Sequence, residues 1–235
     1  MSARAPVEFF PALSAIKICR HAFIERVPGI DVSHDKAQAL QALEAVHREA
    51  RRELGITDWP LLTAQQVHGN KIALIDSEVG LARCADRGRR SAASLPDKEF
   101  AGCDGFITNQ HQIALGIHVA DCCAVYLVDP KTPAIGLVHS GKKGTEQEIA
   151  AKAIEQLREN FGSKPADLIV QLSPCIRPPH YEIDFGATIV EQCRNAGVKQ
   201  IYAASECTAC DVARYYSYRA EKGKTGRMLA LLGLV

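Results

Sequence analysis

The chain has 235 residues, of which 47% are hydrophobic and 23% charged, and its 28 Lys and Arg residues against 27 Asp and Glu residues give a net charge of +1. Disordered chains combine low hydrophobicity with high net charge, so this composition excludes disorder and predicts a globular protein. The sequence also lacks the dense Lys and Arg runs that nucleic-acid binding requires. We therefore expect a small-molecule partner and no nucleic acid.

Membrane insertion and export are not expected from the sequence. The most apolar stretch, residues 113–128, contains His118 and Asp121 and therefore lacks the continuous apolar length that crosses a bilayer. Near the N-terminus, Arg4, Glu8 and Lys17 interrupt the apolar residues before the core of a signal peptide can form. We expect a cytoplasmic protein without a membrane partner. Its nine cysteines, an odd number, are then buried thiols or ligands rather than paired disulfides.

The first half of the chain contains one predicted helix and two short strands. Apolar residues at steps of three or four from Ala37 to Leu54 predict a helix that starts near Ser33 and stops at Gly55. Residues 61–67 and 71–76 are predicted strands, joined around residues 68–70, where glycine and asparagine favour a turn. Residues 83–98, rich in Arg, Ser and Ala, predict a loop.

Further along, short apolar runs predict buried strands at residues 104–108, 113–119, 124–128 and 134–138. Residues 145–148 form a capping-box pattern, which predicts a helix from Ile149 to Gly162. A strand at 168–172, a helix at 187–195 and a final strand at 228–234 complete the pattern. We expect an α/β (mixed α+β) fold, in which residues 1–235 form a single compact domain with mixed β-sheets flanked by helices.

Three residues that can bind a metal follow predicted strands. His68 follows the strand ending at Val67, Cys122 lies just past the apolar run ending at Ala120, and His139 follows Val138. If these strand ends converge, the three side chains form a set that suits zinc and leaves a fourth tetrahedral position open. Their spacing is not a compact zinc motif, so on spacing alone the two histidines could equally cap turns and the cysteine could be a core thiol.

Several motifs resemble those of the bacterial family known as laccase-domain or multicopper polyphenol oxidase-like proteins, whose members are purine nucleoside phosphorylases. They occur in the family's order and cover most of the chain from about Gln65 onward. The matching motifs are Gln66-Val67-His68-Gly69, Asp104-Gly105-Phe106-Ile107-Thr108, Ala120-Asp121-Cys122, His139-Ser140-Gly141-Lys142-Lys143-Gly144, Tyr181-Glu182, Cys207-Thr208, Ser217-Tyr218-Arg219 and Gly226-Arg227.

The resemblance implies that His68, Cys122 and His139 hold Zn²⁺, the same residues that the strand ends select. It also implies phosphorolysis of adenosine, inosine, guanosine or methylthioadenosine to the free base and (methylthio)ribose 1-phosphate, with a deaminase activity on adenosine. The partners would then be a purine nucleoside and phosphate. Asp121, beside the cysteine, is a candidate for orienting a ligand or moving a proton.

The sequence departs from the family in two places. Lys142 and Lys143 stand where the family has Trp-Arg, so a flexible ammonium replaces a planar guanidinium. Lys143 is our candidate for the phosphate contact, with Arg219 as a second. The family's N-terminal Gly-Val-Ser and Ser-Leu-Asn-Leu motifs are hard to find in residues 28–37, which puts substrate contacts from that region in doubt.

The Cys207–Cys210 spacing is that of half a zinc ribbon or of a redox motif, and we interpret it as a packed structural segment because its first half matches the family's Cys-Thr motif. His111, His118 and His180 are assigned no role beyond a place in the pocket wall.

Three other functions compete with the phosphorylase. A multicopper oxidase, as in the family's older label, would use most of its histidines, generally in His-x-His pairs, whereas this chain has 8 His and no such pair, so zinc fits better than copper. A thiol hydrolase or deamidase would use Cys122 as nucleophile and His139 as base. A non-catalytic binding protein is the third alternative, because the Trp-Arg pair is missing.

Overall fold

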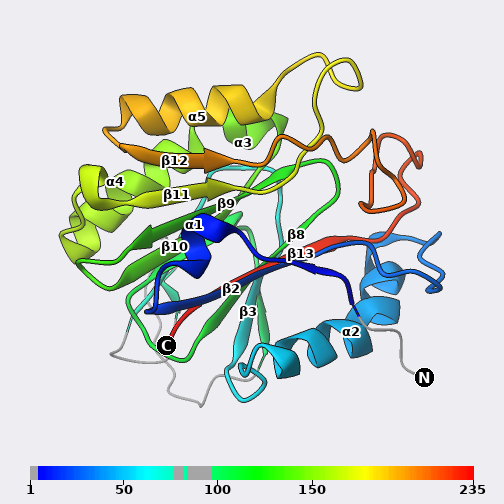
Figure 1. The fold of residues 1–235 in the computed structure, drawn as a ribbon, viewed down its shortest axis with the longest axis horizontal. Helices are drawn as coiled ribbons and strands as arrows, with labels where there is room; N and C mark the ends of the chain where they lie inside the picture. The colour runs from blue at the N-terminus through cyan, green and yellow to red at the C-terminus, as the bar shows by residue number, and fades with distance from the viewer. Residues whose placement is uncertain (1–4, 77–81, 84–96) are drawn as a thin grey trace.

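The computed structural model describes residues 5–76, 82–83 and 97–235, and within them it shows a mixed α/β fold with two mixed β-sheets and five α-helices, as predicted (Figure 1). One sheet has six strands in the order β1 (Val7–Glu8), β2 (Cys19–Ile24), β13 (Met228–Leu234), β8 (Ala114–Val119), β3 (Leu61–Ala64) and β6 (Lys98–Phe100). In this sheet β3 runs parallel to both β8 and β6, and the other neighbours are antiparallel.

The second sheet has seven strands in the order β12 (Gln200–Ala203), β11 (Ile169–Leu172), β9 (Cys123–Asp129), β10 (Ala134–Ser140), β7 (Gly105–Thr108), β4 (Ala73–Ile75) and β5 (Ala82–Arg83). Its centre is antiparallel, because β9 and β10 form a hairpin with Val138 opposite Val125. The pairs β11–β12 and β4–β7 are parallel. Cys122 and His139 lie at the open end of this hairpin, where β9 begins and β10 ends.

The three longest helices of the described residues cover the outer faces of the two sheets, whereas α1 contacts β2 of one sheet and β11 of the other. Figure 1 shows α2 below the first sheet, with α4 and α5 above the second. One core lies between the sheets and extends under α2, and a second core joins the far face of the second sheet to α4 and α5. The helices are α1 (Pro11–Ser14), α2 (Lys36–Glu53), α3 (Lys142–Glu146), α4 (Ile149–Phe161) and α5 (Phe185–Asn195), with a 3₁₀ turn at Pro165–Asp167. In the described part of the chain, no helix has the length and apolar character needed to cross a membrane.

Two predicted strands are shorter than expected and one predicted helix cap is wrong, although the helix itself is present as α4. The strand expected at 61–67 ends at Ala64, because Gln66 and His68 adopt positive φ angles of 63° and 60° that no strand accepts. The strand expected at 71–76 shrinks to β4, which lies in the other sheet, so the segment around His68 is a crossover between sheets. The capping box also fails. Thr145 belongs to α3, where its hydroxyl lies 2.8 Å from that of Ser140, and α4 starts after Glu148, whose side chain makes no capping hydrogen bond.

Other boundaries shift by a few residues. The helix expected from Ser33 begins at Lys36, after Asp35, whose carboxylate accepts a hydrogen bond from the Gln38 N–H as an N-cap. The helix expected at 187–195 begins at Phe185, again after a capping aspartate, Asp184. Most of the loop expected at 83–98 lies outside the described residues. The strand β2 was not predicted, because Arg20 and His21 interrupt its apolar pattern.

Candidate metal and nucleoside site

The structure brings His68, Cys122 and His139 together. His68 lies on the crossover between β3 and β4, Cys122 immediately precedes β9, and His139 lies near the end of β10. The candidate ligand atoms of the three side chains are all within 4.8 Å of one another. The two imidazole rings meet edge to face, with 4.9 Å between their centroids. His139 is buried, Cys122 is partly buried and His68 is exposed, so the cluster opens to solvent on the His68 side.

Asp104, which sequence reasoning missed as a site residue, organises this cluster. Its fully buried carboxylate accepts the backbone N–H groups of His68 and Gly69, each at 2.8 Å, and lies 2.9 Å from Nδ1 of His139. With Nδ1 bound to Asp104, His139 presents Nε2 to the cluster. A carboxylate that orients a metal-binding histidine through its other ring nitrogen is a recurrent feature of zinc sites. Its position in the quoted Asp-Gly-Phe motif was the one available signal.

The pKa values of the cluster describe a thiolate beside a protonated imidazole, which loses its proton when a metal binds. Burial raises the pKa of Cys122, but His139 and His68 outweigh burial and lower the pKa of the thiol to about 6. Burial lowers the pKa of His139, but the Cys122 thiolate and the Asp104 carboxylate raise it to about 9. For Asp104, hydrogen bonds from His139 and from the two backbone amides outweigh burial and lower the pKa. Cys122 is therefore poised to be a thiolate, the form in which cysteine binds a metal.

The donor set and the free space fit zinc. Two imidazole nitrogens and one thiolate are common zinc ligands, and three of them leave a fourth position open. Gly141 provides the space, since a Cβ atom there would lie 2.6 Å from Sγ of Cys122 and 3.4 Å from Cδ2 of His68. Because its φ of −96° is accessible to any residue, steric room rather than backbone conformation explains a glycine at this position.

A cavity of about 650 Å³ lies against the cluster, which forms part of its wall. Tyr181, Phe185 and Tyr218 supply aromatic surface, and the rings of Tyr181 and Phe185 are 5.0 Å apart. Burial lowers the pKa values of Lys36 and Arg227, so a bound anion would stabilise their charged forms. Among the described residues, the Lys, Arg, Asp and Glu side chains of the lining are five cations and one carboxylate, namely Lys36, Lys142, Arg219, Lys222, Arg227 and Asp121. The cavity therefore suits a ligand with both a flat ring and a negative charge.

The other predicted site residues differ in their relation to this cavity. Arg219 lines it, with its guanidinium 4.8 Å from the centroid of the Tyr181 ring. Asp121 lines it too, but both its carboxylate oxygens are occupied: one accepts the Thr208 hydroxyl at 2.8 Å and the other accepts the Arg219 N–H at 2.7 Å. Lys143 is exposed and is not part of the lining, whereas its neighbour Lys142 is.

Among the histidines assigned only to the pocket wall, His118 lines the cavity, and His111 and His180 do not. The Cys207 segment pairs with the segment around Cys175 through the backbone: Cys207 and Cys175, both free thiols, form an isolated parallel β-bridge, and the Thr208 N–H donates to the Cys175 carbonyl at 3.3 Å. Thr208 in turn donates to Asp121, the neighbour of Cys122. This segment thereby supports the loop that carries the thiol ligand.

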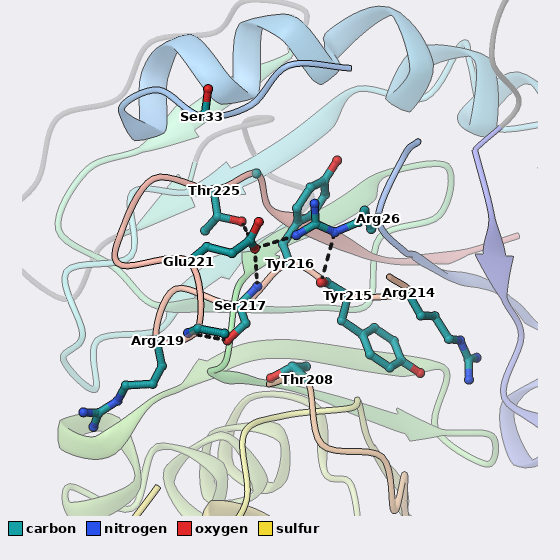
Figure 2. A network of polar contacts seen from close by, with 12 residues as sticks. Arg26, Ser33, Thr208, Arg214, Tyr215, Tyr216, Ser217, Arg219, Glu221 and Thr225 are labelled. Atoms are coloured by element: carbon teal, nitrogen blue, oxygen red, sulfur yellow. Dashed lines mark hydrogen bonds and ion pairs between the residues drawn. The ribbon is translucent and has the colours of Figure 1, made fainter. Parts of the chain in front are cut away.

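A network centred on Glu221 holds the C-terminal side of the cavity (Figure 2). The Glu221 carboxylate accepts the Ser217 N–H at 3.0 Å and the Thr225 hydroxyl at 2.5 Å, and it pairs with Arg26 at 2.5 Å. Arg26 also donates from Nε to the Tyr215 carbonyl at 3.2 Å. The loop tied down in this way carries four of the lining residues, Tyr218, Arg219, Lys222 and Arg227.

The fold and this site define a mixed α/β protein with a His–Cys–His cluster at the wall of a cationic and aromatic cavity. A family model described as multi-copper polyphenol oxidoreductase laccase matches residues 29–186 and 182–235, so the chain belongs to that family and the resemblance seen in the sequence is confirmed. Purine nucleoside phosphorylase YlmD of Geobacillus stearothermophilus is 30% identical to it over 206 residues, which cover 72% of this chain and 70% of that protein.

Other relatives agree with this assignment. Purine nucleoside phosphorylase YlmD of Bacillus subtilis is 26% identical over 202 residues, covering 73% of this chain and 69% of that protein. The crystal structure of YlmD from G. stearothermophilus has a similar fold, with a TM-score of 0.76 and 22% identity over 100% of this chain and 97% of that one. The Bacillus licheniformis hypothetical protein YfiH gives a TM-score of 0.73 at 23% identity, covering 92% and 93% of the two chains.

Proposed function

We propose that this chain is a zinc-dependent purine nucleoside phosphorylase. The observation that carries the proposal is the position of the His68–Cys122–His139 cluster in the wall of a cavity that also presents aromatic rings and five cations. The names of the curated relatives support an enzyme of this kind. We include in the proposal a single domain over residues 1–235 and the cytoplasmic location expected from the sequence.

The chemistry requires a site that binds a purine nucleoside and phosphate side by side. Phosphate attacks C1′ of the ribose while the bond from C1′ to the purine nitrogen breaks, and the base departs with the electron pair of that bond. The aromatic side chains, Tyr181 and Tyr218 among them, offer flat surfaces for the purine. The cations, Arg219 among them, neutralise the phosphate and position it for attack.

A zinc ion in this site would be held by His68, Cys122 and His139 and would supply a Lewis acid at the cavity wall. When His139 loses a proton, the hydrogen bond to Asp104 favours keeping the remaining proton on Nδ1, so that Nε2 becomes the nitrogen available to a metal. Asp121 acts by holding the backbone of Arg219 at the cavity, through the Arg219 N–H. We propose that the same site accepts adenosine, inosine, guanosine or methylthioadenosine, with deamination of adenosine as a side activity.

One observation favours a second function. The pKa of Cys122 is lowered to about 6 and that of His139 is raised to about 9, which is the thiolate–imidazolium state of a cysteine hydrolase. His68 argues for the metal enzyme, since a thiol hydrolase needs no second imidazole beside the sulfur. Zinc is preferred to copper because the three ligands form one cluster among the described residues, whereas a multicopper centre needs several histidine-rich sites.

Metal analysis combined with a phosphate-dependent assay tests the proposal. Purified protein should contain about one zinc per chain and should release purine base and ribose 1-phosphate from nucleosides only when phosphate is present. Cys122→Ala should lose both the metal and the activity, while Cys123→Ala, the matched control at a fully buried thiol of β9, should retain the metal. Base release that is equally fast without phosphate would identify a hydrolase. Phenol oxidation that requires copper would identify an oxidase.

A further inference from the structure

One carboxylate lies between two cations beside the cavity. Glu182 precedes α5 and places Oε1 at 3.7 Å from Nζ of Lys142 and Oε2 at 3.7 Å from Nη2 of Arg219. Each oxygen thus faces a different cation, and the two cations come from distant parts of the chain. Lys142 and Arg219 line the cavity, whereas Glu182 does not belong to its lining.

These ion pairs are weak enough to be exchanged. The side chains of Lys142, Glu182 and Arg219 are 47%, 59% and 56% exposed, and exposed pairs of this kind contribute little to stability. The position of Arg219 does not depend on Glu182, because its guanidinium stacks on Tyr181 and its N–H is bound by Asp121. Figure 2 shows the Arg219 guanidinium directed away from the Glu221 network, so that network leaves its charge free.

We propose that Glu182 occupies the phosphate-binding position as an internal anion and that phosphate displaces it. A phosphate dianion carries more charge than one carboxylate and also presents two oxygens to two cations, so it can replace Glu182 between Lys142 and Arg219. Lys142, which stands where the family has tryptophan, is then the lysine that contacts phosphate, in place of Lys143. The choice of phosphate as the anion rests on the proposed function.

The displaced carboxylate has a consequence for selectivity. An anion must compete with Glu182 for both cations at once. An anion of low charge, or one that contacts only one of the cations, therefore gains less binding free energy than a phosphate that contacts both. The cost of displacing Glu182 from its two ion pairs is the same for every anion that takes its place, so only an anion that regains more from both cations, such as a doubly charged one, binds well. The residue is a specificity-determining group at the cavity margin, and it takes no part in bond breaking.

Isothermal titration calorimetry of the full chain with inorganic phosphate, in the absence of nucleoside, tests the inference. Glu182→Gln should bind phosphate about three- to tenfold more tightly, the competition expected from two exposed ion pairs. Lys142→Ala should bind phosphate more weakly than the wild type. The double variant with both Glu182→Gln and Lys142→Ala should lose most of the tighter binding of Glu182→Gln, because only Arg219 is then left to contact phosphate. Glu146→Gln, at an exposed carboxylate of α3 outside the cavity lining, is the matched control and should behave as wild type.

Unchanged or weaker phosphate binding in Glu182→Gln would overturn the inference. So would an equal gain in Glu146→Gln, which would show that general surface charge is responsible. The outcome is separable from that of the proposed function. Tighter phosphate binding in Glu182→Gln without phosphate-dependent base release in the wild type would refute the phosphorylase and keep the anion position. Phosphorolysis by the wild type, together with unchanged phosphate affinity in Glu182→Gln, would support the phosphorylase and overturn the role proposed for Glu182.

Discussion

Replacing Asp104 with asparagine removes the group that connects the ligand cluster to the fold. The carboxylate accepts three hydrogen bonds, from His68 N, Gly69 N and His139 Nδ1, and its side chain is fully buried. An asparagine of the same shape can turn its oxygen to only part of this set, and its NH₂ group then faces a donor. At about 1.5–3 kcal/mol for each hydrogen bond to a charged group, the loss of one or two bonds should cost about 1.5–6 kcal/mol of unfolding free energy.

The same substitution should weaken zinc binding. Loss of a carboxylate that orients a ligating histidine typically reduces metal affinity about 10- to 100-fold. A competition titration against a chromophoric chelator measures the affinity, and urea unfolding of the metal-free protein measures the stability. Asp129→Asn is a matched control, since Asp129 is also a buried aspartate, accepts backbone N–H groups of Lys131 and Thr132, and lies at the opposite end of β9. It should lose stability and keep its zinc affinity. Wild-type zinc affinity in Asp104→Asn would refute the assignment of His139 as an oriented ligand.

Three further predictions follow from the geometry. Lys142→Ala should raise the phosphate concentration needed for half-maximal rate about tenfold, and Lys143→Ala should raise it less, because only Lys142 lines the cavity. Steady-state kinetics measures both values, and a larger effect of Lys143→Ala would mean that Lys143 contacts phosphate. Gly141→Ala should release zinc more readily in a chelator assay, because the added Cβ would displace Sγ of Cys122; unchanged release would mean that the cluster has room to relax. Burial lowers the pKa of His47 to about 4, so the unfolded chain binds the extra proton between about pH 6.5 and 4, and stability should fall by about 1.4 kcal/mol per pH unit as pH drops through that window. His21 and His118, whose pKa values burial lowers to about 4 and about 3, add to the slope in the same window. Since Nε2 of His47 is buried without a hydrogen-bond partner among the described residues, His47→Leu should reduce the slope measured by urea unfolding at several pH values by about 1.4 kcal/mol per pH unit, and an unchanged slope would contradict the assignment.

Local sequence patterns determined the elements whose signals are local. The helix α2 was predicted from its apolar spacing and ends near Gly55, and the central strands were predicted from short apolar runs. These predictions succeed because the periodic pattern of apolar residues can be read within a short window of the sequence. The family motifs marked His68, Cys122 and His139 as one set, and the structure brings them together. The strand-end argument holds for Cys122 and His139, at the open end of the β9–β10 hairpin, but not for His68, which reaches the cluster from a crossover between the two sheets.

Tertiary structure decided the features that depend on residues far apart in the chain. The contact of Asp104 with His139 spans 35 positions and requires β10 to pair with β7, and the pairing of Glu182 with Lys142 and Arg219 joins three separate segments. Thr145 shows how a local pattern can be overridden, because its hydroxyl finds Ser140 instead of a helix N-terminus. The choice between Lys142 and Lys143 depends on which way each side chain leaves α3. Neighbouring helical residues point about 100° apart, so only the packing of that helix against the cavity places one lysine in the wall and the other in solvent.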